Sequence, residues 1–259
     1  MCRHLGYLGP ALPVAELILD RPHSLLRQSW APADMRGGGT INADGFGVGW
    51  YPGPSSPPVV YRRATPMWSD AGLPGVARAV AGTSVLAATR SATVGMPVIE
   101  TACAPFLEGR WLFSHNGIIA GWPHSVADIA GRLSVVDLIT LDAPTDSALL
   151  WALVRGHLRQ GVPLDKAVEY VVADVAAAAP GSKLNVMATD GHTLVATAWT
   201  HSLSTLATSD RVVLASEPLD DDERWSAVPD RHLVVATRTD NQVVKLIVRP
   251  LDVAGDEAP

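Results

Sequence analysis

The chain has 259 residues, of which 47% are hydrophobic and 18% charged, and its formal net charge at pH 7 is −6. These totals allow one globular domain with a substantial core, and they indicate neither a basic surface for nucleic acid nor a polybasic membrane anchor. No uncharged run approaches the ~18 residues that a membrane-spanning helix needs, so a small molecule is the expected partner.

The start of the chain does not resemble a secretion signal. Pro10, Pro13 and Glu16 interrupt its apolar run, and no small-residue cleavage site follows. We therefore expect a cytoplasmic protein. The two cysteines, Cys2 and Cys103, are too few for a disulfide framework, and no CxxC or HExxH spacing indicates a metal site.

Short strands and turns dominate the N-terminal half. Strands are predicted at 2–9, 46–51, 58–63, 84–90 and 110–116, with short helices at 14–20 and near 75–82 and a glycine-rich loop at 31–45.

The middle of the chain is predicted to be helical. Apolar residues at 149, 150, 153, 154 and 158 follow helical spacing, and Thr145 or Asp146 stands at the N-cap position. A second helix at 164–179 ends at Pro180-Gly181.

The C-terminal third returns to strands. They are predicted at 183–190, 192–200, 203–209, 211–217, 232–238 and 242–248, and Asp190-Gly191 indicates a tight turn between the first two. This order favours an α+β fold with two antiparallel sheets face to face and helices outside. One domain over residues 2–253 is expected, followed by a disordered tail at 254–259.

Arg90 follows a predicted strand in the stretch "ATRSATVG" and precedes a turn that ends at Gly95. An arginine in this position can bind a carboxylate with both of its terminal nitrogens. The alternative is an ordinary surface arginine.

Asn116 and Gly117 follow the strand that contains His115. A glycine N–H and an asparagine side chain can act as two donors to an oxyanion. The alternative is a hairpin turn, for which Asn-Gly is a favoured sequence.

Asp146 stands at the start of the first long helix. Its carboxylate could cap that helix or could bind an ammonium group.

Cys2 gains a possible role if Met1 is removed, because its thiol and a free α-amine then share one carbon. Near neutral pH such an amine is partly neutral and can accept the thiol proton.

The ordered set of Cys2, "DGFGVGWY", "TRSATVG", "CAPF", "HNG" and "TD" resembles the class II glutamine amidotransferases, whose glutaminase domain is an N-terminal-nucleophile hydrolase. The resemblance runs from Cys2 to about Ala152. It departs from the commonest pattern at Ser91 and Val94, where some glutaminase domains have an aromatic residue and a histidine.

This resemblance implies a four-layer αββα sandwich and a set of site residues. Cys2 would be the nucleophile, while Asn116 and Gly117 would form the oxyanion hole. Arg90, Thr93 and the backbone of Val94 would bind the substrate α-carboxylate, and Asp146 would bind its α-amine. The reaction would pass through a γ-glutamyl thioester without a cofactor.

Within the family, the closest likeness is to the stand-alone amidohydrolases of ergothioneine biosynthesis, which cleave γ-glutamyl-hercynylcysteine sulfoxide to glutamate and hercynylcysteine sulfoxide. Two alternatives remain at this point: a glutaminase subunit that supplies ammonia to a partner synthase, and a non-catalytic binding protein on the same fold. Homo-oligomerisation is left open.

The hercynyl end of that substrate carries a trimethylammonium group. Aromatic faces beside negative charge suit such a cation. We therefore expect at least one of Trp30, Trp68, Trp122 and Trp225, with an acidic residue, at the far end of the substrate site.

Overall fold

Two antiparallel sheets form the centre of the computed structural model, which describes residues 2–35, 41–239 and 244–251. The first sheet contains, in spatial order, β11 (Ser226–Ala227), β9 (Ser204–Ala207), β10 (Val212–Ala215), β1 (Arg3–Pro13), β4 (Ala81–Thr89), β2 (Phe46–Tyr51) and β3 (Val59–Arg63). The second contains β13 (Val244–Pro250), β12 (His232–Arg238), β8 (Thr193–Ala198), β7 (Lys183–Thr189), β6 (Trp111–Ile118) and β5 (Phe106–Glu108).

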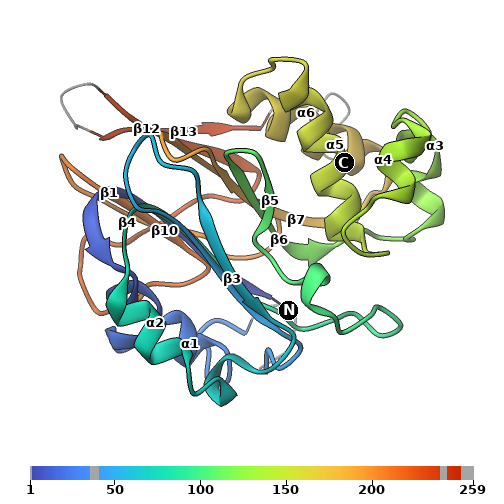
Figure 1. Cartoon of the computed structure of the whole chain (residues 1–259). Helices are drawn as coiled ribbons and strands as arrows, with labels where there is room; N and C mark the ends of the chain where they lie inside the picture. Colours follow the sequence, from blue (N-terminus) through green and yellow to red (C-terminus); the bar gives the residue numbers. More distant parts are fainter. Residues whose placement is uncertain (1, 36–40, 240–243, 252–259) are drawn as a thin grey trace.

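Helices cover the outer face of each sheet, as Figure 1 shows. On the first sheet lie the π-helical turn η1 (Glu16–Asp20), α1 (Leu25–Gln28) and α2 (Leu73–Ala79). On the second lie α5 (Asp146–Arg159) and α6 (Leu164–Ala178), with α3 (Ala127–Ala130) and α4 (Val135–Ile139) beside them. The remaining turns are the 3₁₀ helices η2 (Met67–Ser69), η3 (Glu100–Ala102) and η4 (His124–Val126). The predicted αββα sandwich is confirmed.

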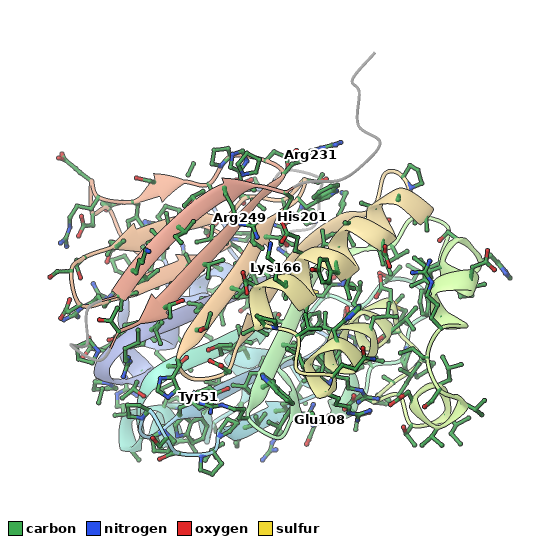
Figure 2. All side chains as sticks on the ribbon, turned by 90° about the horizontal axis from the view of Figure 1, so that it is seen from above. Tyr51, Glu108, Lys166, His201, Arg231 and Arg249 are labelled. Carbon is green, nitrogen blue, oxygen red and sulfur yellow. The ribbon has the colours of Figure 1, made fainter. Side chains whose placement is uncertain are left out.

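An ionic cluster fixes α6 to the edge strand β13. Glu169 on α6 is 7% exposed and accepts hydrogen bonds from both terminal nitrogens of Arg249 and from Lys166. Hydrogen bonding from Arg249 lowers the pKa of Glu169 to about 2, so the carboxylate stays charged at neutral pH. Figure 2 labels Lys166 and Arg249 where the helix crosses the sheet.

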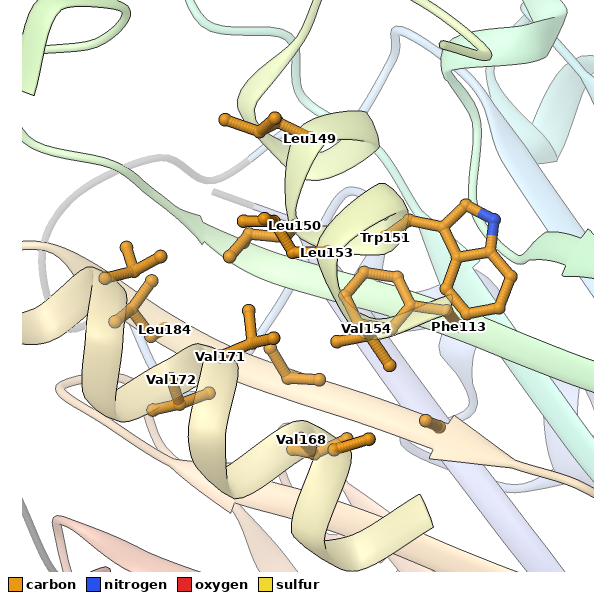
Figure 3. Packing of buried hydrophobic residues seen from close by; sticks show 14 of the residues in the cluster. Phe113, Leu149, Leu150, Trp151, Leu153, Val154, Val168, Val171, Val172 and Leu184 are labelled. Carbon is orange, nitrogen blue, oxygen red and sulfur yellow. The ribbon is translucent and has the colours of Figure 1, made fainter. Parts of the chain in front are cut away.

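Three apolar clusters join the four layers. Figure 3 shows the one beneath α5 and α6, where Trp151 stacks on Phe113 of β6 with 5.4 Å between ring centroids. Residues of both sheets, among them Leu8 and Leu194, form the cluster between the sheets. Alternation along each strand explains this division, because successive side chains point to opposite faces.

Most predicted elements are present, and the differences are local. The short helix predicted at 14–20 is confirmed and is a π-helical turn over Glu16–Asp20, and β1 continues to Pro13 across a register shift. The turn at Asp190-Gly191 is confirmed, with Asp190 Oδ1 accepting from two backbone N–H groups. Met1, the predicted tail at 254–259 and residues 242–243 lie outside the described residues.

No helix in the described ranges is long and apolar enough to cross a membrane.

Candidate functional site

Cys2 lies immediately before β1, which runs between β10 and β4 in the first sheet. Its side chain is half-buried, with Sγ 3.7 Å from the Ser91 carbonyl oxygen. It lines a small pocket, about 20 Å³, together with Arg90, His115 and Ser147 among other residues. The fold therefore brings Cys2 to residues from β4, β6 and α5 and to Arg90 after β4.

Asn116 lies on the facing sheet. His4 Nδ1 and Ser114 Oγ are 3.3 Å apart across the gap between the sheets. Because residues two apart on a strand share a face, Cys2 and Asn116 also face this gap. The Asn116 side chain is 0% exposed, and its oxygen and nitrogen have no hydrogen-bond partner among the described residues.

A buried amide without hydrogen-bond partners costs free energy of folding, so the unpaired side chain of Asn116 must have another role. The hairpin alternative provides none, because Asn116 and Gly117 lie inside β6 and pair with Asn185 and Leu184 of β7. A Cβ atom at position 117 would lie 1.8 Å from the Lys183 carbonyl oxygen. Only glycine fits at position 117. The unpaired side-chain amide of Asn116 is therefore explained not by a turn but by a donor group that could serve a ligand.

His115 was given no role by the sequence, yet it connects three elements. Its Nε2 lies 2.9 Å from the Lys183 carbonyl oxygen, and its Nδ1 lies 2.9 Å from Ser147 Oγ. Since a carbonyl can only accept, Nε2 carries the proton. The ring thus joins β6 to the start of β7 and to the first turn of α5.

Arg90 follows β4 and is 8% exposed, so the alternative of an ordinary surface arginine is wrong. Its backbone N–H donates to Gly45 O at 2.7 Å, and its carbonyl accepts from Asp44 N–H at 2.9 Å. Its guanidinium donates to the Pro97 carbonyl at 2.9 Å. The residues just before β2 and the segment after β4 therefore hold this arginine beside Cys2.

Thr93 and Val94 lie in the turn that follows Arg90. Met96 N–H donates to the Thr93 carbonyl at 2.9 Å, and Gly95 adopts a φ of 90°. The Val94 side chain is fully exposed, so only its backbone is available to a ligand on the Arg90 side. Neither residue lines the small pocket around Cys2.

Asp146 is 3% exposed and is the first residue of α5. The N-cap is Thr145, whose Oγ1 accepts from Ala148 N–H at 3.2 Å. Asp146 instead accepts from Ile119 N–H at 3.1 Å and Ser147 N–H at 2.7 Å. Its carboxylate is thereby fixed beside the end of β6, one residue from the pocket-lining Ser147.

Two buried histidines, His4 and His201, are neutral at physiological pH. Burial lowers the pKa of His4 to about 3 and that of His201 to about 4.

In the ranges that the structure describes, no group of three or more His, Cys, Asp or Glu side chains is arranged to hold a metal ion.

Cys103 is fully buried, and its Sγ contacts the carbonyl oxygens of Arg63 and Ile99, each at 3.4 Å. Burial raises the pKa of this thiol to about 11, so it stays protonated at neutral pH. This environment agrees with the prediction of an inert core residue.

The four tryptophans of the predicted cation site are dispersed. Trp30 and Trp68 are each 44% exposed, and Trp122 packs against the cluster under α5 and α6. Trp225 donates to Asp220 at 2.8 Å and lines a separate cavity on the outer face of the first sheet. None of the four lines the pocket around Cys2.

Comparison with known proteins supplies the family. The chain is 43% identical over 238 residues to the gamma-glutamyl-hercynylcysteine sulfoxide hydrolase of Mycobacterium tuberculosis (strain CDC 1551 / Oshkosh), covering 92% of this chain and 94% of that protein. It is 41% identical to the protein of the same name from Mycolicibacterium smegmatis, covering 97% and 100%. No family model matches the chain.

Among solved structures, a glutamine aminotransferase class-II domain protein from Silicibacter pomeroyi superposes with a TM-score of 0.65 at 22% identity. The match covers 96% of this chain and 99% of that protein. At this identity the likeness supports the fold alone.

Proposed function

The chain belongs to the gamma-glutamyl-hercynylcysteine sulfoxide hydrolase family, and on that premise we propose that it cleaves the γ-glutamyl amide of this sulfoxide through Cys2. The products are glutamate and hercynylcysteine sulfoxide. The observation that carries the choice of site is the buried, unpaired amide of Asn116, on the sheet that faces Cys2.

The first half of the reaction forms a thioester. After removal of Met1, the α-amine of Cys2 accepts the thiol proton, and the sulfur attacks the γ-carbonyl carbon. Asn116 Nδ2 and the Gly117 N–H donate to the resulting oxyanion. The protonated amine then passes its proton to the leaving nitrogen as the carbon–nitrogen bond breaks.

The second half consumes water. The α-amine of Cys2 accepts a proton from a water molecule as the water oxygen attacks the thioester carbonyl carbon. This attack again places negative charge on the carbonyl oxygen, next to the oxyanion donors. Collapse of this intermediate releases glutamate and returns the proton to the sulfur. His115 acts as a positioning residue, because its two contacts fix the end of β6 that carries both donors.

The glutamyl head group requires one cationic and one anionic partner. Arg90, with the turn at Thr93 and Val94, receives the α-carboxylate, and the fixed carboxylate of Asp146 receives the α-ammonium. Both side chains are at least nine-tenths buried, which strengthens an ion contact relative to one in open water.

Arg90→Gln is expected to raise KM and to lower kcat/KM by roughly ten- to a hundredfold, because a hydrogen bond to a charged group contributes about 1.5–3 kcal/mol. Steady-state kinetics measures this effect. Arg62→Gln is the matched control, since Arg62 also donates to a backbone carbonyl, that of Cys103, but does not line the pocket. An unchanged KM in Arg90→Gln would contradict the carboxylate role.

The wild-type enzyme is expected to show a kcat/KM for γ-glutamyl-hercynylcysteine sulfoxide at least tenfold above that for free glutamine, because the larger leaving group offers additional contacts. Product release followed by mass spectrometry measures both reactions. Equal values would favour the alternative of an ammonia-supplying glutaminase subunit.

A further inference from the structure

A cavity lies on the outer face of the first sheet, and Cys2 does not line it. Its volume is about 320 Å³, near the lower end of the range for small-molecule sites. It is enclosed by β1, by η1, by the β9–β10 hairpin and by the loop 219–225 that precedes β11. In Figure 1 this is the side of the first sheet that carries α1 and α2.

The first sheet separates this cavity from the catalytic site. Successive side chains of β1 point to opposite faces of the sheet. His4 faces the second sheet, where its Nδ1 lies 3.3 Å from Ser114 Oγ. Tyr7 belongs instead to the apolar cluster on the outer face and lines the cavity. A molecule bound here would therefore leave the gap in front of Cys2 free.

The floor of the cavity is apolar. Five of its lining side chains are at most 9% exposed, namely those of Tyr7, Leu17, Leu206, Val213 and Leu219. The half-buried Trp225 supplies an aromatic wall, and its Nε1–H donates to Asp220 Oδ1 at 2.8 Å, which fixes the indole ring. The interior thus suits the hydrocarbon part of a small ligand.

Two carboxylates lie at the Trp225 end of the cavity, and both already accept hydrogen bonds. Besides the indole, Asp220 accepts from Arg21 at 2.8 Å and from the Asp222 N–H at 3.2 Å. Asp222 accepts from the backbone N–H, Nε and Nη2 of Arg224, with the shortest contact at 2.6 Å.

These occupied carboxylates select the kind of cation that can bind. A primary ammonium or a guanidinium would have to displace the existing donors to form its own hydrogen bonds. A quaternary ammonium donates no hydrogen bond and is held by an aromatic face with negative charge nearby. Trp225 beside Asp220 and Asp222 provides this combination.

Arg211 lies at the other end of the cavity. Its Nε and Nη2 contact Asp210 at 3.3 Å, longer than the roughly 2.7–3.2 Å of an ordinary N–H···O bond, so the guanidinium can bind a second carboxylate. Arg211 is opposite Thr208, whose N–H donates to its carbonyl at 2.9 Å.

The strand register gives the spacing of the two ends. Ser226 of β11 pairs with Thr205 of β9, so Trp225 lies beside Leu206. Thr208 is two residues further along the chain, which corresponds to roughly 7 Å. The aromatic end and the arginine end are therefore close enough for one small molecule to reach both.

We propose that this cavity binds a betaine, a zwitterion whose quaternary ammonium lies against Trp225 and whose carboxylate meets Arg211. The charged groups of the rim form three ion pairs without net charge, Arg21–Asp220, Arg211–Asp210 and Arg224–Asp222. This balance favours a zwitterion over a simple cation or anion. The inference does not rest on the proposed function, because none of these residues lines the pocket around Cys2.

Calorimetry with N,N,N-trimethyl-L-phenylalanine as the probe tests the site, because its ring suits the apolar floor. Two related compounds each lack one charged group: L-phenylalanine has no quaternary ammonium, and the methyl ester of the probe has no carboxylate. Both should bind wild type about threefold or more weakly than the probe.

Trp225→Leu should weaken binding of the probe about threefold or more, whereas Trp225→Phe should keep most of the affinity. Both variants lose the Nε1–H bond to Asp220, but only leucine removes the aromatic face. Trp68→Leu is the matched control, because Trp68 is 44% exposed and lies outside the lining. Thermal unfolding shows whether each variant is folded.

Arg211→Gln should weaken binding of the probe about threefold or more and leave binding of the methyl ester unchanged. A purely structural role of Arg211 would affect both compounds equally. Arg78→Gln is the control, since Arg78 is an exposed arginine that also pairs with an aspartate, Asp20 at 3.1 Å, outside the lining.

The inference is overturned if wild type does not bind the probe, or if Trp225→Leu and Arg211→Gln bind it as wild type does. It is also overturned if Trp225→Phe loses as much affinity as Trp225→Leu, because the indole N–H and not the aromatic face would then matter. A wild type that binds the probe but does not cleave the sulfoxide substrate would support this inference and contradict only the proposed function.

Discussion

Cys2→Ala is expected to abolish hydrolysis, with kcat reduced on the order of 10⁴-fold or more, because we propose that the sulfur forms the covalent intermediate. The fold should be unchanged, since the half-buried side chain makes only one hydrogen bond, to the Ser91 carbonyl, among the residues that the structure describes. Activity assays and thermal unfolding measure the two effects. Cys2→Ser should retain at most a trace, because an amine deprotonates a hydroxyl far less readily than a thiol.

Two controls make this result specific. Cys103→Ala removes the other thiol, which is buried and protonated, and should keep most activity. The intact mass of the purified wild type should correspond to a chain without Met1, since a retained methionine places the amine one residue from the sulfur. Full activity in Cys2→Ala would exclude Cys2 as the nucleophile.

Asn116→Ala is expected to reduce kcat by on the order of a hundredfold or more, with a smaller effect on KM, because the donor that it removes is the one we propose for the oxyanion in the transition state. It should not lower the free energy of unfolding, because the amide it removes is buried and unpaired in the free protein. Loss of activity without loss of stability is therefore the expected combination, measured by kinetics and denaturant unfolding.

Asn185→Ala is the matched control on the neighbouring strand. Asn185 is equally buried, but its side chain bonds the backbone of residues 199–202. Its removal leaves these groups unpaired and should cost at least about 1–3 kcal/mol of unfolding free energy. If Asn116→Ala destabilised the protein as much as Asn185→Ala, the amide would be structural and the oxyanion assignment would be wrong.

The elements that could be predicted from the sequence are those with a strong local pattern of residues. The apolar spacing and the Thr145 cap predicted α5, and Asp190-Gly191 predicted the β7–β8 turn. At Asn116-Gly117 the local signal favoured a turn, whereas the structure has a continuous strand. Pairing with β7 decides this conformation, and a short sequence window does not contain that information.

Other parts of the site lacked a local signal altogether. Ser147 contacts His115 only because α5 packs over the end of β6, so neither residue stood out in sequence. A cavity of about 520 Å³ is lined by segments up to 197 positions apart in the sequence, from Ala33 to Asp230. Such features depend on the packing of distant segments.

The pairing of β1 has a consequence for the order in which the protein is made. Cys2 and its strand leave the ribosome long before β10, one neighbour of that strand, which begins at Val212, and the hydrogen bond from His4 to Ser216 spans 212 positions. Such long-range closure is slow and cannot precede synthesis of both segments. A chain whose translation stops before β10 therefore carries Cys2 on a strand that lacks one of its two neighbours in the sheet.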